Sequence, residues 1–272
     1  MIRALICDLD GTLFLGHGKT VFDLTQRNRD ALEKLKENHI ALYISSGRMA
    51  RFGNEVLMHF GFEDLVSSGF NGGIGIDNGK TVFRHELSSE SARKAMILLK
   101  EREFPYRSAQ IQTYNDVRVF DDLNSPDVQR YREQIKETGI GRIADQEIVP
   151  YLKDPLAQIG KLSIRFHEET QAREAMELLH EEMEDCRITM SDRDLVDVIS
   201  LKAQKGNLID YLITQRSYRK EEIAAIGDGL NDVDMIQKAG WSFAMKNSDK
   251  ELLKEADLIV EDVCECCERI LE

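Results

Sequence analysis

Proline, cysteine and long apolar segments are scarce in this chain of 272 residues. Four prolines leave little room for a disordered linker, so none is expected between its parts. The five cysteines are an odd number without framework spacing, which favours a reducing compartment and a cytoplasmic protein. No segment approaches membrane-spanning length. The apolar start contains Arg3, reaches Asp8 at once, and does not resemble a signal peptide.

Basic residues are also outnumbered by acidic ones. The chain has 36 Lys and Arg against 49 Asp and Glu, which gives a formal net charge of −13. Nucleic acids and anionic membranes are polyanions, so this charge disfavours nonspecific binding to either. An anionic substrate therefore has to be met by local cations or by a metal ion. The length allows one large domain or two unequal ones.

The first chemically informative segment is an apolar run that leads into Asp8, Asp10 and Gly11. Residues two apart on a strand point the same way, and a glycine lets the chain bend. The sequence therefore predicts a strand that ends at Asp8 and a turn that starts at Asp10. Two carboxylates this close repel, and a hard divalent cation, usually Mg²⁺, relieves that repulsion. The alternative is an edge strand that ends in an acidic turn, since Asp and Gly are common turn residues.

Apolar and amphipathic segments alternate in the first and last parts of the chain. Strand and helix patterns follow each other up to residue 67, and the same alternation returns from Lys205. This order predicts a Rossmann-like, doubly wound parallel sheet of the α/β class. A hairpin with its turn at Asp77, Asn78 and Gly79 marks the change to antiparallel structure.

The middle of the chain has strand pairs alternating with helices, which is typical of a small α+β domain. We therefore expect a core made of residues 1–83 and 197–272 and an inserted α+β domain of residues 84–196.

Polar residues follow the predicted core strands. In open α/β sheets, ligands bind outside the carboxyl ends of the parallel strands. The first strand ends in Asp8, the second in Ser46 and Gly47, and the strand 223–226 in a segment that contains Asp228. A metal-bound phosphoryl group requires groups of the kind found here: carboxylates, a hydroxyl, a glycine amide and the nearby Lys205. Taken singly, Ser46 is also a plausible strand-end cap and Lys205 an ordinary helix-start lysine.

Four segments carry a resemblance to a known family. DLDGTL from residue 8, SSGR from 45, KG at 205 and GDGLND from 227 resemble the four ordered motifs of the haloacid dehalogenase (HAD) superfamily, and specifically its Cof-like phosphatases with a type IIB cap. The likeness extends to Asn71, Gly72 and AMKNS from residue 244. It implies a Mg²⁺-dependent hydrolase of phosphomonoesters that acts on a small phosphorylated metabolite, such as a sugar phosphate or a phosphorylated cofactor.

The resemblance also implies roles for three aspartates. Asp8 is the expected nucleophile, which forms an aspartyl phosphate. Asp10 is the expected acid and base. The expected metal ligands are the Asp8 carboxylate, the backbone carbonyl of Asp10, and Asp228. Dehalogenases lack an acid at the position of Asp10, because a leaving halide needs no proton, so a phosphatase is favoured.

Five further residues complete the site that the resemblance implies. The hydroxyl of Ser46, the amide of Gly47 and the ammonium of Lys205 are expected to hold phosphoryl oxygens. Asn231 is expected to face the phosphate or Lys205. Asp232 is expected to support the metal or the lysine without touching the substrate. The inserted domain is the expected mobile cap that selects the substrate.

The sequence departs from the family pattern in two places. Ser46 stands where threonine is usual, which keeps the hydroxyl. Lys246 and Ser248 stand where glycine and alanine are usual. Lys246 is interpreted as a surface lysine, with an extra cation near the substrate as the alternative. The cluster of Cys264, Cys266 and Cys267 is interpreted as ordinary thiols, because no partner residues with zinc-site spacing lie nearby.

Two other functions stay open on the same residues. A phosphomutase or phosphotransferase would use the same aspartyl phosphate, and a noncatalytic metabolite-binding regulator would keep the fold without the reaction. A monomer or weak homodimer is expected, with no nucleic-acid or membrane partner.

Overall fold

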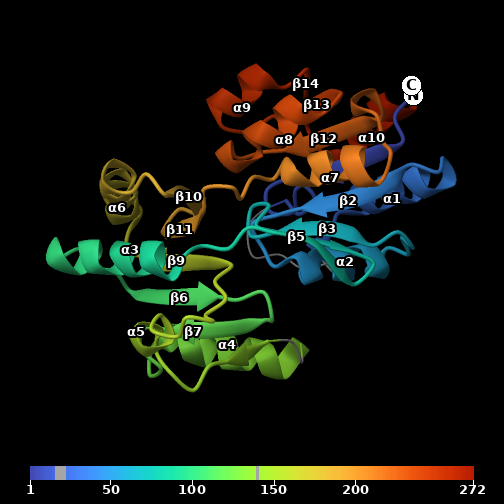
Figure 1. Ribbon diagram of the computed structural model, residues 1–272. Coiled ribbons are helices and arrows are strands. Elements are labelled where there is room, and N and C mark those ends of the chain that lie inside the picture. The colour runs from blue at the N-terminus through green and yellow to red at the C-terminus, as the bar shows by residue number, and fades with distance from the viewer. Residues whose placement is uncertain (16–22, 139–140) are drawn as a thin grey trace. The chain divides into compact units, whose positions relative to one another are not determined.

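A computed structural model describes residues 1–15, 23–138 and 141–272 (Figure 1). These residues form two compact units. The first comprises Met1–Arg84 and Gln204–Glu272, and the second His85–Ala203. Among the described residues, no helix combines the length and the apolar character needed to cross a bilayer.

An eight-stranded sheet forms the centre of the first unit, in the order β14-β13-β12-β1-β2-β3-β4-β5. Its strands are β1 (Ala4–Cys7), β2 (Ala41–Ser45), β3 (Val66–Gly69), β4 (Ile74–Asp77), β5 (Lys80–Arg84), β12 (Ile223–Gly227), β13 (Trp241–Met245) and β14 (Leu258–Val260). The pairs from β14 to β3 are parallel, and β4 and β5 are added antiparallel. Strand β1 lies between β12 and β2, so the segment that ends in Asp8 runs through the middle of the sheet.

Helices cover both faces of this sheet (Figure 1). They are α1 (Gln26–Glu37), α2 (Ala50–His59), α7 (Asn207–Gln215), α8 (Val233–Lys238), α9 (Lys250–Glu255) and α10 (Val263–Leu271). Leu5 of β1 belongs to a hydrophobic cluster with α1, α2 and α10, whereas Ile6 belongs to one with α7, α8 and α9. Burial on both faces explains why β1 is apolar without alternation. The predicted doubly wound α/β sheet is confirmed.

The predicted turn between β4 and β5 is also present. Asn78 and Gly79 have positive φ angles of 45° and 81°, and Asp77 pairs with Lys80 across the turn. Positive φ at both central positions is typical of the two-residue hairpin turn, which Asn-Gly favours.

All five cysteines are free and buried. Cys7, Cys264, Cys266 and Cys267 lie in the same hydrophobic cluster as Leu5. Burial raises the pKa of Cys7 and of Cys266 well above the usual thiol value. These two thiols therefore stay protonated, and the burial of all five agrees with the interpretation of the three near the C-terminus as ordinary thiols.

The second unit is built on a six-stranded sheet in the order β10-β11-β9-β6-β7-β8. Its strands are β6 (Ser108–Gln112), β7 (Val117–Phe120), β8 (Arg142–Ile143), β9 (Lys161–Arg165), β10 (Cys186–Asp192) and β11 (Leu195–Ser200), and its helices are α3 (Ser89–Glu101), α4 (Pro126–Thr138), α5 (Ile148–Tyr151) and α6 (Glu169–Glu182). Neighbouring strands are antiparallel except β7 and β8. This is the α+β architecture expected for the insertion.

The two faces of this second sheet differ in polarity. Leu162 and Ile164 of β9 pack with α3 and α6 in a hydrophobic cluster. On the alternate positions, Lys161 Nζ lies 2.7 Å from Asp197 Oδ2 in a buried ion pair. The expected boundary at residue 196 falls inside β11, which pairs with both β9 and β10 and therefore belongs to this sheet.

Candidate active site

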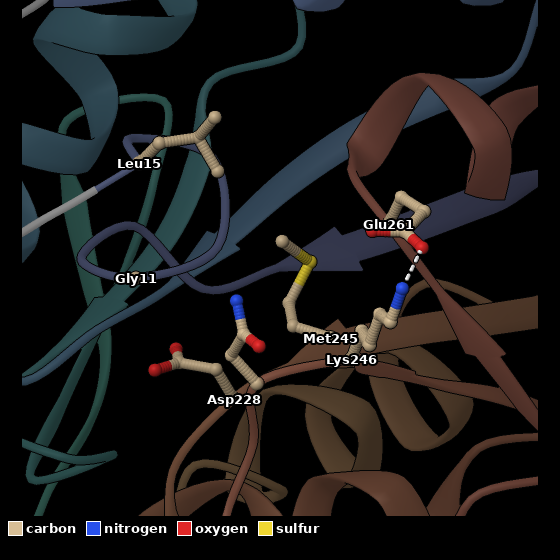
Figure 2. Close-up of a pocket in the computed structure, with 7 residues that line it drawn as sticks. Gly11, Leu15, Asp228, Met245, Lys246 and Glu261 are labelled. Carbon is tan, nitrogen blue, oxygen red and sulfur yellow. Dashed lines mark hydrogen bonds and ion pairs between the residues drawn. The ribbon is translucent and has the colours of Figure 1, made fainter.

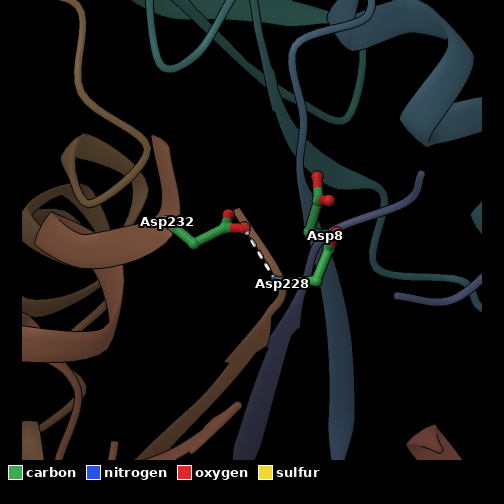
Figure 3. A group of neighbouring side chains, drawn as sticks. All are labelled: Asp8, Asp228 and Asp232. Atoms are coloured by element: carbon green, nitrogen blue, oxygen red, sulfur yellow. Dashed lines mark hydrogen bonds between the residues drawn. The ribbon is translucent and has the colours of Figure 1, made fainter. Parts of the chain in front are cut away.

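The carboxyl ends of β1, β2 and β12 carry the residues that the sequence singled out. Asp8 follows β1 directly, Ser46 follows β2, and Asp228 follows β12. Adjacent parallel strands end at the same edge of the sheet, so these residues meet there. Figure 3 shows the carboxylates of Asp8, Asp228 and Asp232 close together at this edge.

Gly11 lets the turn after Asp8 approach the loop after β12. The amide of Asp8 still bonds to Ile226 O at 3.1 Å, and the chain then folds back so that Gly11 N donates to Phe14 O at 2.9 Å. The φ angle of Gly11 is +87°, and a Cβ atom there would lie 2.2 Å from Asp228 Oδ2. Only glycine satisfies both the left-handed backbone and this close approach.

Lys205 is a buried cation between two carboxylates. Its side chain is 1% exposed, and Nζ lies 2.7 Å from Asp8 Oδ1 and 2.6 Å from Asp232 Oδ1. Burial lowers the pKa of Lys205, but Asp232 and Asp8 together raise it above the usual lysine value. The lysine therefore stays charged despite its burial, as a buried ion pair requires.

Gly72 brings the turn after β3 against the segment that carries Lys205. Its φ angle is +84°, and a Cβ atom there would lie 1.7 Å from Gln204 O. The side-chain Nδ2 of Asn207 donates to Gly72 O at 3.1 Å. The start of α7 is thus held against β3, which aims Lys205 at Asp8.

Asp232 is committed to hydrogen bonds inside the loop after β12. Oδ1 accepts from Lys205, and Oδ2 accepts from the backbone amides of Asp228 and Gly229, both at 3.0 Å. Asp232 ends a short 3₁₀ turn, η3 (Leu230–Asp232). It holds Lys205 and the loop that carries Asp228, which is the arrangement expected of a residue that supports the lysine.

The acidic group formed by Asp8, Asp228 and Asp232 suits the binding of a hard divalent cation. One oxygen each from Asp8, Asp228 and Asp232 lie within 4.8 Å of one another. Burial raises the pKa of Asp8 well above its usual value, Lys205 opposes this, and the charges of Asp232 and Asp228 add to it. Three carboxylates thus face one ammonium group, and a cation would balance the excess negative charge. Because both oxygens of Asp232 carry hydrogen bonds, Asp8 and Asp228 are the better ligands.

Asn71 links the residues expected to bind phosphate. Its amide N donates to Ser46 O at 3.0 Å, and its Oδ1 accepts from Asn231 Nδ2 at 3.0 Å. A Cβ atom on Gly47 would lie 3.0 Å from the same Oδ1. Asn71 has a φ angle of 55° and is buried. It joins the loops after β2, β3 and β12, a role that its place in the motif pattern does not indicate.

Asp10 turns its carboxylate to Arg48, outside the group of Asp8, Asp228 and Asp232. Arg48 Nε donates to Asp10 Oδ2 at 2.6 Å, and Nη2 donates to Oδ1 at 2.5 Å. Arg48 belongs to the second motif, but the motif alone indicates no role for its side chain. The expectation that Asp10 binds metal rests on its backbone carbonyl, and the position of the side chain leaves that expectation in place.

A cavity of about 400 Å³ borders Asp228 on the side of β13 and β14 (Figure 2). It is lined by Gly11, Leu15, Asp228, Met245, Lys246, Asn247 and Glu261. At its rim Lys246 pairs with Glu261, and the two side chains are 61% and 62% exposed. This pairing favours the interpretation of Lys246 as a surface lysine.

Comparisons with known proteins agree with this geometry. Residues 5–266 match the model of the haloacid dehalogenase-like hydrolase family. Phosphatase YwpJ of Bacillus subtilis is 24% identical over 276 residues, which cover 95% of this chain and 94% of that protein. The 5-amino-6-(5-phospho-D-ribitylamino)uracil phosphatase YbjI of Escherichia coli is 25% identical over 261 residues, which cover 94% of this chain and 89% of that protein.

A solved structure has the same fold. It is a haloacid dehalogenase-like hydrolase from Bacteroides thetaiotaomicron, with a TM-score of 0.75, 23% sequence identity, and coverage of 99% of this chain and 100% of that one. The family model spans nearly the whole chain and includes all four motifs. The protein therefore belongs to the haloacid dehalogenase-like hydrolases, which confirms the resemblance carried by its motifs and the prediction that it is an enzyme.

Proposed function

We propose that the protein is a Mg²⁺-dependent phosphatase that hydrolyses a small phosphorylated metabolite through an aspartyl phosphate on Asp8. The observation that carries this proposal is the buried Asp8, paired with Lys205 through one oxygen and placed beside Asp228. The names of the relatives YwpJ and YbjI, both phosphatases, support the reaction class. The substrate in the name of YbjI is a phosphorylated metabolite of the size we propose.

In the first step, a carboxylate oxygen of Asp8 attacks phosphorus. Lys205 binds Oδ1, so we assign the attack to Oδ2. The new Asp8 O–P bond forms as the bond from phosphorus to the leaving oxygen breaks, and Asp10 gives that oxygen a proton. The ammonium of Lys205 is proposed to balance the charge on the phosphoryl oxygens.

In the second step, water attacks the phosphorus of the aspartyl phosphate. Asp10, now a carboxylate, takes a proton from that water, which restores its own proton and frees Asp8. Inorganic phosphate leaves, and no redox change occurs.

Three groups at the ends of β2 and β12 complete phosphate binding. The Ser46 hydroxyl, the Gly47 amide and the Asn231 side chain are proposed to donate to the phosphoryl oxygens. Asn71 keeps them in register through its bonds to Ser46 and Asn231. When bound, Mg²⁺ would be held by Asp8, Asp228 and the backbone carbonyl of Asp10, and it would polarise the phosphoryl group. Selection of the leaving group is assigned to the second unit, acting as a cap.

The experiment that tests this function is a phosphate-release assay over a panel of sugar phosphates, phosphorylated cofactors and nucleotides, with kcat/KM for each hit. Hydrolysis of one or more compounds with Mg²⁺ is expected. A requirement for a bisphosphate activator, with transfer of phosphate to a second substrate, would instead assign a mutase. Binding of metabolites without turnover would assign a regulator.

Removal of divalent metal is expected to abolish activity, because the carboxylates at the site then lack their counter-charge. Added Mg²⁺ should restore activity and raise the melting temperature, since a ligand that binds only the folded state stabilises it. An Asp228→Asn variant should need at least about tenfold more Mg²⁺ for the same rise.

Asp30→Asn is the matched control for this experiment, since Asp30 is an exposed aspartate on α1. It should respond to Mg²⁺ as the unmodified protein does. Full activity in the complete absence of divalent cations would refute the role of the metal.

Loss of the acid at position 10 is expected to depend on the leaving group. An Asp10→Asn variant should lose about 10²- to 10⁴-fold in kcat/KM for an alkyl phosphate, whose leaving oxygen needs a proton. An aryl phosphate with an acidic phenol leaves without protonation, and its kcat/KM should change much less. Equal losses for both esters would show that Asp10 is not the acid.

A further inference from the structure

We propose that Arg48 is a positioning residue that sets the orientation of the Asp10 carboxylate for proton transfer to and from the reacting oxygen. The inference rests on the proposed function and adds a residue to it. It follows from a pair of hydrogen bonds that the motif pattern does not predict.

The contact between Arg48 and Asp10 is bidentate. Nε reaches Asp10 Oδ2 at 2.6 Å and Nη2 reaches Oδ1 at 2.5 Å. A guanidinium and a carboxylate joined by two parallel bonds are held coplanar, so the pair fixes direction as well as distance. A single bond would leave the carboxyl group of Asp10 free to rotate.

Arg48 is itself held from several sides. Its amide N donates to Ser46 Oγ at 3.2 Å, and its carbonyl accepts from the amide of Phe70 at 2.9 Å. Its guanidinium lies 4.6 Å from the ring centre of Phe52 and 5.9 Å from that of Phe14. Both rings provide favourable cation–π contacts. The guanidinium of Arg48 is therefore held in place without a substrate.

Phe14 also belongs to the turn that carries Asp10. Gly11 N donates to Phe14 O, and Asp10 and Phe14 form a β-bridge. Arg48 thus reaches Asp10 in two ways. Its guanidinium lies over the ring of Phe14, which is bonded to the same turn, and it donates two hydrogen bonds to the Asp10 carboxylate. These contacts join the loop after β2 to the turn after β1 at the Asp10 carboxylate, the group proposed to transfer the proton.

Two other roles for Arg48 fit these contacts less well. An exposed ion pair contributes little to stability, but the side chains of Arg48 and Asp10 are only 25% and 22% exposed, and their geometry is bidentate. A phosphate-binding arginine would keep its fork for the substrate. Here Asp10 takes up Nε and Nη2, and Lys205 is the cation that touches Asp8.

The test compares two esters in Arg48→Met and Arg48→Lys. Because kcat/KM reports steps up to phosphorylation of Asp8, it isolates the acid role. We expect about a 10²-fold loss in kcat/KM for an alkyl phosphate and less than about a threefold loss for an aryl phosphate with an acidic phenol. Arg48→Lys should not rescue the alkyl ester, because an ammonium cannot form the fork.

Arg51→Met is the matched control, because Arg51 is an exposed arginine on α2, three residues after Arg48, and pairs with Glu55 at 3.5 Å. It should change neither ester. In an Asp10→Asn background, Arg48→Met should cause no further loss for the alkyl ester, since both changes remove one function. Equal losses for both esters, or a further loss in that background, would overturn the proposal.

Two measurements are independent of turnover. Affinity for inorganic phosphate should be unchanged in Arg48→Met, and a marked weakening would assign Arg48 to the phosphoryl group instead. In a crystal structure of the variant, the Asp10 carboxylate should rotate or occupy several conformers, and an unchanged single orientation would overturn the proposal. If the unmodified protein hydrolysed no ester while Asp10 still moved in the variant, the proposed function would fail, and only the orientation of Asp10 by Arg48 would stand.

Discussion

An Asp8→Asn variant is expected to fold normally and to release phosphate at least about 10³-fold more slowly than the unmodified protein. An amide oxygen is a poor nucleophile, so the covalent step through Asp8 is blocked. Asparagine has nearly the same size as aspartate and can still accept the hydrogen bond from Lys205. The loss should therefore appear in kcat and not in the amount of folded protein.

The stability of this variant follows from the charges around position 8. Burial, Asp232 and Asp228 all raise the pKa of Asp8, and Lys205 opposes them. A neutral side chain at position 8 removes a buried negative charge. It also removes one of the two ion pairs of Lys205, which keeps its ion pair with Asp232. These changes oppose each other, so a small shift in melting temperature is expected.

Asp30→Asn is the control for the same chemical change at an exposed site. It should keep full activity. The measurements are initial rates on the best substrate of the panel and a thermal unfolding curve, both for each variant. Together they separate a loss of activity from a loss of folded protein. Substantial turnover by Asp8→Asn, after deamidation is excluded by mass spectrometry, would rule out Asp8 as the nucleophile.

Lys205→Met is expected to lose stability as well as activity. The substitution leaves Asp8 and Asp232 buried without their cation, and breaking a buried ion pair from one side costs about 3–5 kcal/mol. Unfolding in urea should show this loss in the free energy of unfolding. Activity should fall with it, because the proposed partner of the phosphoryl oxygens is gone.

The pH range of this stabilisation follows from the direction of the pKa shift. Asp232 and Asp8 raise the pKa of Lys205 in the folded protein, in spite of burial. A raised lysine pKa stabilises the folded state fully below the unfolded pKa of about 10.4, and this contribution is lost only as the pH rises through the higher folded value. The titration of Lys205 itself should therefore add no pH dependence to this difference across neutral pH.

A second substitution separates charge from packing. If uncompensated carboxylates cause the loss, Lys205→Met combined with Asp232→Asn should recover part of the stability, and Mg²⁺ should stabilise Lys205→Met more than the unmodified protein. Lys34→Met, at an exposed position on α1, should change the free energy of unfolding by less than about 0.5 kcal/mol. A loss below about 1 kcal/mol in Lys205→Met would contradict the buried ion pair.

Much of the fold could be predicted because its signals are local. The apolar strand before Asp8 lacks alternation because helices bury both of its faces, and Thr25 caps α1 by accepting from the amide of Asn28. The hairpin at Asn78 and Gly79 follows from the φ angles that those residues tolerate. The far boundary of the insertion is not a local signal, since a strand pattern does not show where a sheet ends, whereas the pairing of β11 with β9 and β10 does.

The candidate site shows where local signals end. The order of the motifs indicates which residues gather at the carboxyl edge, and the structure places Asp8, Asp228, Asp232 and Lys205 there together. The links made by Asn71 and Arg48 carry no comparable signal. Asparagine and arginine are common in loops, and their partners lie 160 and 38 residues away in the chain.

The sequence by itself determined which chemical groups this protein has and at which strand ends they stand, because strand patterns and glycine turns depend on neighbouring residues. Only the tertiary structure decided that the side chains of Asp8 and Asp10 have different partners. Asp8 faces Lys205 and the acidic group, whereas Asp10 turns to Arg48. Two carboxylates two residues apart have the same local signal. The side chains that separate them come from the loop after β2 and from the turn before α7, which only folding brings to β1.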